Sequence, residues 1–312
     1  MFEHKNLLHI ILMKLIIVSI KNFGIARKRI SPFDIIAKSM IYYFEKKHII
    51  TTMIHARYYN NYHIDPNDVV LIFSPALWTF RKTIFLPKKV IVYNTEPINV
   101  KNWYNKIFKK IMRKASIIFD YSKYNLLKYE NKQKYYLPPV YSPYLEHLFN
   151  ENYDDTITTK DIDILFYGTI TGKRRRYIKK ELSKISNIKV KFIEIIPTMK
   201  EQTNLIQRSK IVLDYFYYDE DRCIDYPRCS YLIANKVFVI HETPRKEEYD
   251  EEFSYYIVTC PYHKIVKTCL KYLNKTEDER NIIVENAYQW FKESNNLDKY
   301  IPYDDIITLL EK

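Results

Sequence analysis

Short apolar runs alternate with amphipathic segments of helical period along this chain, and this alternation constrains the fold more than any other feature. The second half shows it most clearly, with apolar runs at 162–167, 188–196, 211–217 and 237–240 and helical patterns between them. These runs are rich in Ile, Val, Leu and Tyr, which is typical of strands covered on both faces. Because strands that alternate with helices form parallel sheets, the sequence predicts an α/β fold.

The first half repeats the pattern and predicts a second sheet of the same kind. Its expected strands are 15–20, 69–73, 90–93, 117–119 and 135–137, and its expected helices are 31–47, 100–113 and 123–130. After residue 161 the expected helices are 174–186, 198–209, 226–235, 263–273 and 277–293, with a further strand at 255–258. Ser31 and Pro32 favour a helix start, because serine caps a helix and proline is tolerated in its first turn.

A polar stretch, 146–160, separates the two series and carries little apolar periodicity. Such a composition is typical of a connecting loop. A chain of 312 residues is long enough for two domains. We therefore predict two Rossmann-like, doubly wound domains, 1–145 and 161–293, joined by a linker at 146–160. The tail, 294–312, is expected to pack back on the first domain.

The chain is basic, with a net charge of +13. Basic proteins bind nucleic acid, anionic membranes or phosphate-bearing substrates. The lysines are spread along the helical segments, however, and a coding bias towards AT-rich codons is the first explanation for them and for the 30 tyrosines. The sequence contains no zinc-finger spacing, no RRM-type aromatic motif and no heptads behind a basic region. We therefore expect no specific nucleic-acid partner.

Cysteine usage and the N-terminal segment favour a cytoplasmic protein. None of the four cysteines forms a C-x-x-C pair, so a zinc site has little support from the sequence, and reduced thiols are expected. The apolar stretch 7–20 is broken by His9 and Lys14 and is too short for a membrane span. We interpret it as a buried strand from Lys14 to Ile20 with an appended segment before it. A membrane-surface anchor, and hence peripheral membrane contact, is the alternative.

Glycine is scarce: the chain has only Gly24, Gly168 and Gly172, each in the first predicted strand-to-helix loop of a domain. Ligands of open α/β sheets bind in such loops. The loop GTITGKRRR suits an anion, because Gly168 lets the backbone approach a ligand and Lys173 and Arg174 add charge to a helix N-terminus. Its spacing matches neither G-x-x-x-x-G-K-[ST] nor G-x-G-x-x-G, which disfavours a P-loop ATPase or a nicotinamide enzyme. A solvated basic first turn is the alternative.

A second group of polar residues is expected at the same sheet edge. The segment YYDEDRCIDYPRCSYLIANKVFVIHE carries Asp225 and Arg228 where a helix begins, and Glu242 at the end of the next strand. A carboxylate there can accept both hydroxyls of a ribose, and an arginine can hold a diphosphate. Taken alone, each of these residues is more often a partner in a surface salt bridge.

Several segments resemble glycosyltransferases of the GT-B fold, and they are most similar to the "group 1"-like enzymes that use a nucleotide-sugar. They are LFYGTITGKRRRYIKKEL, KIVLDYFYYDEDRCIDYPRCSYLIANKVFVIHE, and VIVYNTEP with FDYSKYNLLKY, all within residues 89–290. The resemblance implies two Rossmann-like domains facing a cleft, with the acceptor in the first domain, the donor in the second, and no obligatory metal. The family's F-Y-G-x-x-x-x-R-R loop matches Phe166, Tyr167, Gly168, Lys173 and Arg174, its E-x-x-R segment is Asp225 and Arg228 here, and its later carboxylate is Glu242. We expect the donor nucleotide-sugar to contact Gly168, Thr169, Lys173, Arg174, Tyr218, Asp225, Arg228 and Glu242.

The chain also departs from the family's pattern. The E-x7-E pattern is not intact, since Arg222 and Ser230 stand at the positions of its two glutamates. The L-N-x-H-Y strand motif is LDYFY at 213–217, without the histidine. These departures weaken the expected contacts to the donor sugar and leave those to the diphosphate better supported.

The expected chemistry follows from the leaving group. Glycosyl transfer develops negative charge on the departing diphosphate, which basic side chains and a helix N-terminus can stabilise without Mg²⁺. An inverting enzyme needs a base for the acceptor hydroxyl. Glu96, in YNTEP, is the first candidate and Asp120 the second, although Glu96 is equally explained as a hydrogen-bond acceptor in a turn. A retaining enzyme needs no such base. A metal-dependent alternative would use 219-DED-221 as its D-x-D motif.

We therefore expect metal-independent transfer from a UDP- or GDP-linked sugar, which is a substrate and not a cofactor, to a glycan, protein or lipid acceptor. Two alternatives stay open: a non-enzymatic basic module that binds an anionic polymer, and a sugar-nucleotide epimerase or hydrolase on the same fold. Steep salt dependence without nucleotide selectivity would indicate the first. Product analysis with the donor alone would reveal the second.

Overall fold

The computed structural model describes residues 14–19, 32–80, 84–98, 106–130, 132–138, 140–217, 219, 222–246 and 251–312. These residues divide into two compact units. Unit 1 contains the described residues up to Tyr144 together with Asn296–Lys312, and unit 2 contains Leu145–Asn295. The predicted segment before the first strand, the helix start at Ser31 and the loop glycine Gly24 lie outside the described residues.

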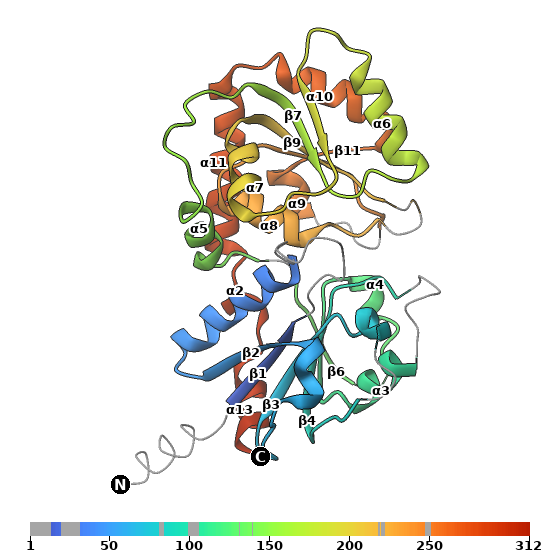
Figure 1. Cartoon of the computed structure of the whole chain (residues 1–312), viewed down its shortest axis with the longest axis vertical. Coiled ribbons are helices and arrows are strands. Elements are labelled where there is room, and N and C mark those ends of the chain that lie inside the picture. Colours follow the sequence, from blue (N-terminus) through green and yellow to red (C-terminus); the bar gives the residue numbers. More distant parts are fainter. Residues whose placement is uncertain are drawn as a thin grey trace. The chain divides into compact units, whose positions relative to one another are not determined.

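Unit 1 is built on a six-stranded sheet in which all neighbouring strands are parallel (Figure 1). The strands are β1 (Lys14–Ser19), β2 (Ile50–His55), β3 (Val69–Phe73), β4 (Lys89–Asn94), β5 (Ile117–Asp120) and β6 (Gln133–Tyr136), in the order β2-β1-β3-β4-β5-β6. The helical segments before residue 144 are α2 (Pro32–Lys46), η1 (Ala56–Asn61), η2 (Pro75–Phe80), α3 (Lys106–Lys114) and α4 (Lys123–Leu126). Alternate residues of β1, β3 and β4 join α3 in one buried core, as expected for strands covered by helices.

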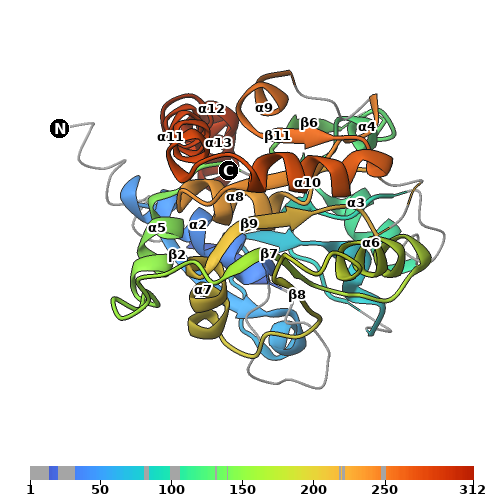
Figure 2. The same ribbon diagram turned by 90° about the horizontal axis from the view of Figure 1, so that it is seen from above.

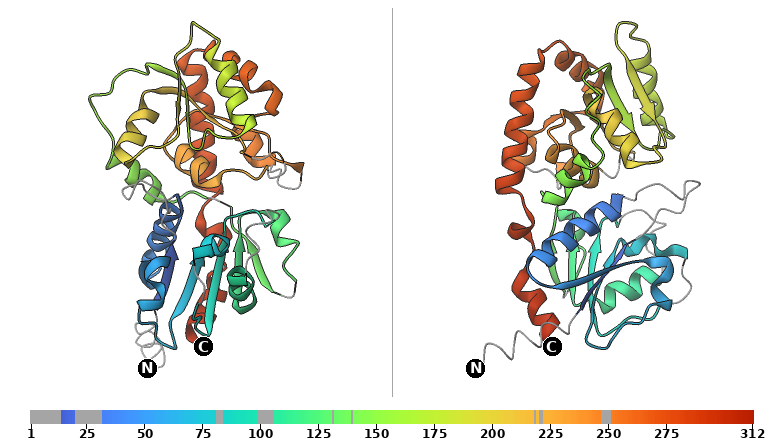
Figure 3. Two further views of the ribbon diagram at one scale, coloured as in Figure 1. Left: turned by 45° about the vertical axis from the view of Figure 1, so that its right-hand side comes forward. Right: turned by 60° about the vertical axis from the view of Figure 1, so that its left-hand side comes forward.

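The C-terminal residues complete unit 1. Helices α12 (Leu297–Tyr300) and α13 (Tyr303–Glu311) follow a bridge that pairs Tyr141 with Asn296. Lys89 Nζ donates to the carbonyl of Leu310 at 3.2 Å, which ties α13 to the start of β4 (Figure 3). The last helix of the chain thus packs on the first sheet.

Unit 2 has a five-stranded parallel sheet in the order β11-β10-β9-β7-β8. The strands are β7 (Ile162–Tyr167), β8 (Val190–Ile193), β9 (Ser209–Asp214), β10 (Val239–Glu242) and β11 (Val258–Cys260). The helical segments are α5 (Pro143–Asn150), α6 (Lys173–Ser183), α7 (Met199–Gln207), α8 (Tyr226–Ala234), α9 (Glu251–Tyr256), η4 (Tyr262–Lys264), α10 (Ile265–Leu273) and α11 (Glu277–Ser294). Helices α6 and α10 pack together on the core that lines one face of the sheet (Figure 2).

The structure differs from the sequence-based expectation at three places. The stretch interpreted as a linker, 146–160, begins inside helix α5, because Leu145, Leu148 and Phe149 share one buried face at helical spacing. The strand expected at 255–258 is mostly helix α9, and β11 begins only at Val258. Strand β2 was not expected, because it is an edge strand in which only Ile54 is buried, and two threonines interrupt its apolar residues.

Within the described ranges, no helix combines the length and the apolar character needed to cross a membrane.

Candidate functional site

The polar residues of unit 2 gather where the strand order reverses. Strand β7 is flanked by β8 on one side and β9 on the other, so the loops after β7 and β9 leave the sheet in opposite directions. In open α/β sheets this switch point, at the carboxyl ends of the strands, is where ligands bind. The loop GTITG follows β7, and the segment from Tyr215 follows β9.

Gly168 is required at its position for two separate reasons. Its φ is +129°, a conformation that L side chains rarely adopt. A Cβ there would also lie 3.0 Å from Arg228 Nη2. The Gly168 N–H donates to the carbonyl of Ile193 at 2.9 Å, which fastens the loop to the end of β8. The first loop residue therefore lets a buried guanidinium approach the main chain.

Gly172 turns the chain into helix α6. It is the N-cap residue, with φ +103°, and a Cβ there would lie 3.4 Å from the ring of Tyr217. Thr171 and Tyr217 share a hydrogen bond between their hydroxyls at 3.2 Å. The loop after β7 is thus packed against the segment after β9.

Arg174, in the first turn of α6, is held on several sides. Its Nη1 donates to the carbonyl of Phe216 at 3.1 Å, and its Nη2 donates to Glu242 Oε1 at 2.5 Å. The guanidinium carbon lies 4.1 Å from the ring centre of Tyr262, a cation–π contact. The Tyr262 hydroxyl donates to the carbonyl of Arg174 at 2.8 Å. Its geometry is therefore fixed before any ligand binds.

Glu242 ends β10 and is fully buried. Its Oε2 accepts the N–H of Phe216 at 3.1 Å, while Oε1 accepts from Arg174. The carboxylate thus connects β10, the segment after β9 and the first turn of α6. These protein partners replace the ribose hydroxyls expected from the sequence, and the ribose contact stays a prediction.

Arg228 lies between two carboxylates. Its Nη1 is 2.6 Å from Asp214 Oδ1 and its Nη2 is 3.1 Å from Asp225 Oδ2. Burial lowers the pKa of Arg228 and the two carboxylates raise it, and the carboxylates prevail. Asp225 also caps helix α8, since it accepts the N–H of Arg228 at 3.4 Å. Arg228 is thus protonated, its charge is compensated by two carboxylates, and its guanidinium is held next to Gly168.

Arg175 is a buried cation that the sequence analysis did not single out. Its guanidinium donates to the carbonyls of Thr169 at 2.8 Å and Tyr215 at 3.0 Å. Among the described residues it has no carboxylate partner, and burial, followed by the charge of Arg228, lowers its pKa. The signal was present as four consecutive basic residues, 173–176, but helical phase decides which of them points inwards. Asp214 and Asp225 act on its pKa in the opposite direction, so Arg175 is a buried cation under the loop that lies near two carboxylates.

The remaining expected donor residues fall into two groups. The side chains of Thr169 and Lys173 are exposed at the loop and at the start of α6. Tyr218, and with it Glu220 and Asp221 of the D-x-D alternative, lies outside the described residues. Asp219 is described and lies 3.6 Å from Arg174 Nη2.

Asp120, in unit 1, is a buried hub. It is the last residue of β5 and fully buried. It accepts hydrogen bonds from the Tyr129 hydroxyl at 2.6 Å, the Ser122 N–H at 2.8 Å, and the side-chain amides of Asn94 at 2.9 Å and Asn125 at 3.1 Å. Burial raises its pKa to about 7 although these bonds act in the opposite direction. A carboxylate so enclosed does not reach an acceptor hydroxyl in this geometry.

Glu96 is connected to that hub through its main chain. The side-chain amides of Asn94 and Asn125, which contact Asp120, also donate to the carbonyl of Glu96 at 2.7 and 3.0 Å. The Glu96 side chain is half-buried. The two candidate bases therefore differ in role: Asp120 positions the segment that contains Glu96, through Asn94 and Asn125.

A cavity of about 290 Å³ lies at the opposite edge of the second sheet, by the amino ends of β7 and β9. Its lysines are paired with carboxylates: Lys160 with Glu277 at 2.8 Å, Lys210 with Asp163 at 2.7 Å and Lys236 with Glu285 at 2.8 Å. The cavity lies at the amino-terminal edge of the sheet, whereas ligands of open α/β sheets bind at the carboxyl-terminal edge, so the switch point is the better candidate site.

Comparison with solved structures decides the fold. An α-glucosyltransferase in complex with UDP-glucose and DNA containing an abasic site is similar over 96% of this chain and 99% of its own, with a TM-score of 0.64 and 11% identity. The N-terminal domain of Candida albicans trehalose-6-phosphate phosphatase is similar over 96% of both chains, with a TM-score of 0.57 and 8% identity. The trehalose 6-phosphate synthase of Burkholderia multivorans gives a TM-score of 0.51 at 7% identity over 91% of this chain. The chain has the GT-B fold.

Sequence comparisons give less information about this chain than the structural comparisons do. No protein-family model matches the chain. An uncharacterised protein of Acanthamoeba polyphaga mimivirus, L140, is 24% identical over 234 residues, which are 72% of this chain and 74% of that protein. The fold predicted from the sequence, two Rossmann-like parallel sheets of the GT-B type, is confirmed by the structural neighbours. Identities this low show the fold alone, so the activity has to be argued from the residues of the candidate site.

Proposed function

We propose that this GT-B chain is a glycosyltransferase that takes its sugar from a nucleotide-sugar bound at the switch point of unit 2. The observation that carries the proposal is the charge of the loop 168–175: a glycine with φ +129°, then a helix start with three consecutive basic residues, of which Arg175 is buried without a described carboxylate partner. A helix N-terminus that carries several basic side chains is suited to an anionic ligand. The UDP-glucose held by a neighbour of the same fold supports the choice of donor.

The leaving diphosphate is stabilised by fixed groups. Helix α6 has 11 residues, and the Arg176 N–H closes its first turn on the carbonyl of Gly172 at 3.1 Å. The first amides of a helix point out of its N-terminus, where an anion can accept from them. Lys173 adds an exposed, mobile charge, and Arg175 adds a fixed one. Arg174 is already engaged with Glu242. Groups fixed in advance of the reaction stabilise developing charge without reorganising, and they do so here without a divalent cation.

Acceptor activation is assigned to unit 1. If the reaction inverts the anomeric centre, Glu96 is the general base, held in place through Asn94 and Asn125 by buried Asp120. If the reaction retains configuration, no base on the acceptor side is needed. Glu96→Gln separates the two cases: an inverting enzyme would lose most of its kcat, whereas a retaining enzyme would keep it.

Nucleotide binding is the first test. Titration calorimetry with UDP and GDP should show one of them binding, and Lys173→Ala should weaken that binding by about tenfold. Lys173 is the cleaner variant, because removing Arg174 also leaves the buried Glu242 unpaired. Lys180→Ala, an exposed lysine in the last turn of the same helix, is the matched control and should bind as the native chain does. Failure to bind any nucleoside diphosphate would overturn the donor site.

Turnover is the second test. The chain should transfer sugar to a glycan, protein or lipid acceptor after brief exposure to EDTA. Activity that vanishes and returns with Mn²⁺ would instead support the metal-dependent alternative with its D-x-D motif. Release of free sugar or an epimerised nucleotide from donor alone would point to a hydrolase or epimerase.

A nucleic-acid acceptor is a second candidate, favoured by two observations. Several structural neighbours are α-glucosyltransferases solved with DNA, and this chain carries a net charge of +13. Radiolabelled sugar appearing in duplex DNA would establish this acceptor. DNA binding that falls steeply with salt, with no nucleotide selectivity and no transfer, would indicate the non-enzymatic module instead.

A further inference from the structure

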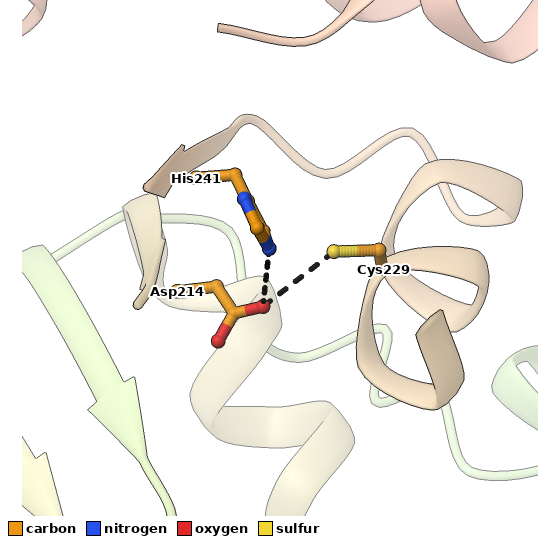
Figure 4. Close-up of side chains that lie close together, drawn as sticks. All are labelled: Asp214, Cys229 and His241. Atoms are coloured by element: carbon orange, nitrogen blue, oxygen red, sulfur yellow. Dashed lines mark hydrogen bonds and ion pairs between the residues drawn. The ribbon is translucent and has the colours of Figure 1, made fainter. Parts of the chain in front are cut away.

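Strand register brings two ligand-type side chains to the same face of the second sheet. Strands β9 and β10 are parallel neighbours, and Asp214 is the register partner of His241. Paired residues of neighbouring strands project to the same side. Helix α8 packs against β10, and its first turn contributes Cys229. Figure 4 shows the three side chains pointing towards one another. All three are buried, with residue exposures of 1% for Asp214 and Cys229 and 0% for His241.

The distances are those of a metal-ligand triangle. Asp214 Oδ2 lies 3.4 Å from His241 Nε2 and 3.5 Å from Cys229 Sγ. One ligand atom from each of the three residues lies within 4.8 Å of the other two. Tetrahedral zinc, with bonds of about 2.0 Å to nitrogen and oxygen and about 2.3 Å to sulfur, holds its ligand atoms roughly 3.3 to 3.8 Å apart. A small inward movement of the three atoms would complete such a site.

The histidine gives an independent indication. Its Nδ1 lies 2.5 Å from the carbonyl of Glu242, and because a carbonyl only accepts, Nδ1 carries the hydrogen. In a neutral ring Nε2 is then the nitrogen with the lone pair, and it is a buried atom without a hydrogen-bond partner in the described structure. It faces a carboxylate oxygen, so two electron-rich atoms oppose each other. A cation between them, either a proton or a metal ion, removes that conflict.

We propose that Asp214, Cys229 and His241 bind a zinc ion. Nitrogen, sulfur and oxygen ligands together suit zinc, whereas Mg²⁺ and Ca²⁺ prefer oxygen alone. The Glu242 carbonyl that fixes the His241 ring is the outer partner typical of a metal-binding histidine. Zinc replaces the thiol proton of Cys229, which is released to solvent.

The metal would act on structure and not on the leaving group. Asp214 uses Oδ2 towards the cluster and Oδ1 towards Arg228, at 2.6 Å. The ion therefore lies behind the Asp214–Arg228 pair and fixes β9, β10 and α8 at the base of the switch point. This site is independent of the proposed transfer, which needs no metal at the diphosphate.

Metal analysis of the full-length protein tests the proposal. The chain is purified without a polyhistidine tag and without chelators, and elemental analysis should find about one zinc ion per chain. After zinc is removed, Co²⁺ should give a thiolate-to-cobalt charge-transfer band. Cys229→Ser and His241→Gln should each lower zinc affinity by more than about tenfold. Cys269→Ser, a cysteine that is equally buried but belongs to the core on the α6 and α10 face, should retain full zinc content.

The native chain alone decides the matter if the variants fold poorly. Zinc added to the metal-free protein should raise its Tm. A native protein that contains no zinc, shows no cobalt band and gains no Tm on zinc addition overturns the proposal. The 3.4 Å contact between Asp214 and His241 is then a direct contact between the two side chains, without a metal ion.

Discussion

Each unit buries an aspartate as the last residue of a central parallel strand, yet the two carboxylates are satisfied in different ways. Asp120, at the end of β5, is surrounded by neutral donors: a tyrosine hydroxyl, two side-chain amides and one main-chain N–H. Asp214, at the end of β9, pairs with the guanidinium of Arg228 and has a thiol and an imidazole beside it. The same residue at the same topological position therefore sits in two electrostatic environments.

The two environments suggest different roles: the Asp120 network holds a segment of the backbone in place, and the Asp214 network is part of the candidate site. Neutral donors fix the geometry around Asp120 but leave its charge costly, which is why its pKa rises to about 7. A guanidinium neutralises Asp214 and at the same time extends the network to Gly168 and Asp225. The first arrangement holds the Glu96 segment, and the second connects the interior of unit 2 to the loop that we propose as the donor site.

Removing the charged partner should have the largest effect. Arg228→Ala removes the guanidinium that neutralises the buried carboxylate of Asp214, so we expect a loss of about 3 to 5 kcal/mol in the free energy of unfolding. Arg228→Lys should recover only part of it, because one ammonium cannot replace two fork contacts. Chemical denaturation, with hydrogen exchange to assign the loss to unit 2, measures both.

An exposed pair of the same chemistry is the matched control. Arg208 makes a bidentate contact with Asp161 at 2.7 and 2.5 Å, but both side chains are more than a third exposed. Solvent screens such pairs, so Arg208→Ala should change stability far less than Arg228→Ala. Equal losses in the two variants would show that burial is not what distinguishes the Asp214 network.

The neutral network around Asp120 predicts that the free energy of unfolding decreases as the pH rises. Because the pKa of Asp120 is raised from 3.8 to about 7, the folded chain holds a proton that the unfolded chain releases. Its contribution is present below pH 4 and is lost as the pH rises towards 7, by up to about 4 kcal/mol. Stability from this group is then constant above pH 7.

Asp120→Asn isolates that contribution. The variant should be flatter than the native chain between pH 4 and 7, and it should be less stable at pH 4 by about 1 to 3 kcal/mol, because an amide group meets donors where a carboxyl accepted from them. Urea denaturation at several pH values gives the comparison. An unchanged slope in the variant would mean that Asp120 is ionised throughout and that neutral donors suffice to hold a charge.

Two glycines sharpen the comparison at the loop. Gly168→Ala meets both an unfavourable φ and Arg228 Nη2 at 3.0 Å, and we expect a loss of about 1 to 3 kcal/mol. Gly172→Ala has a similarly unfavourable φ, but its Cβ would meet the Tyr217 ring at 3.4 Å, an ordinary contact. It should therefore cost less. Thermal and chemical unfolding rank the two, and the reverse order would show that Arg228 moves aside without penalty.

The fold was predictable because parallel strands covered on both faces are continuous apolar runs. Strands β3 and β7 have the predicted bounds, Val69–Phe73 and Ile162–Tyr167. The pattern fails where burial is partial, as in β2, or where a short helix docks through few residues, as in α5. Local sequence does not record which neighbour covers a residue.

The sequence predicts at which sheet edge the candidate residues lie, but it does not predict which side chains contact each other. Gly168, Arg174, Arg228 and Glu242 do meet at one sheet edge. That Glu242 is engaged by Arg174, and that Arg175 rather than Lys173 points inwards, depends on helical phase and on the contact between β10 and the segment after β9. Such pairings join residues up to 68 positions apart, beyond the reach of any local pattern.

The smallest expected effect concerns how Arg174 is held. Tyr262→Phe removes the hydroxyl that donates to the carbonyl of Arg174 at 2.8 Å but keeps the ring 4.1 Å from the guanidinium. Stability should fall by about 1 kcal/mol, the usual net value of one hydrogen bond. Tyr262→Ala removes the ring as well and should cost more and weaken nucleotide binding, because Arg174 loses the surface that orients it. If Tyr262→Ala and Tyr262→Phe bind nucleotide equally well, Glu242 alone fixes Arg174, and the buried carboxylate is then the sole determinant of that arginine's geometry.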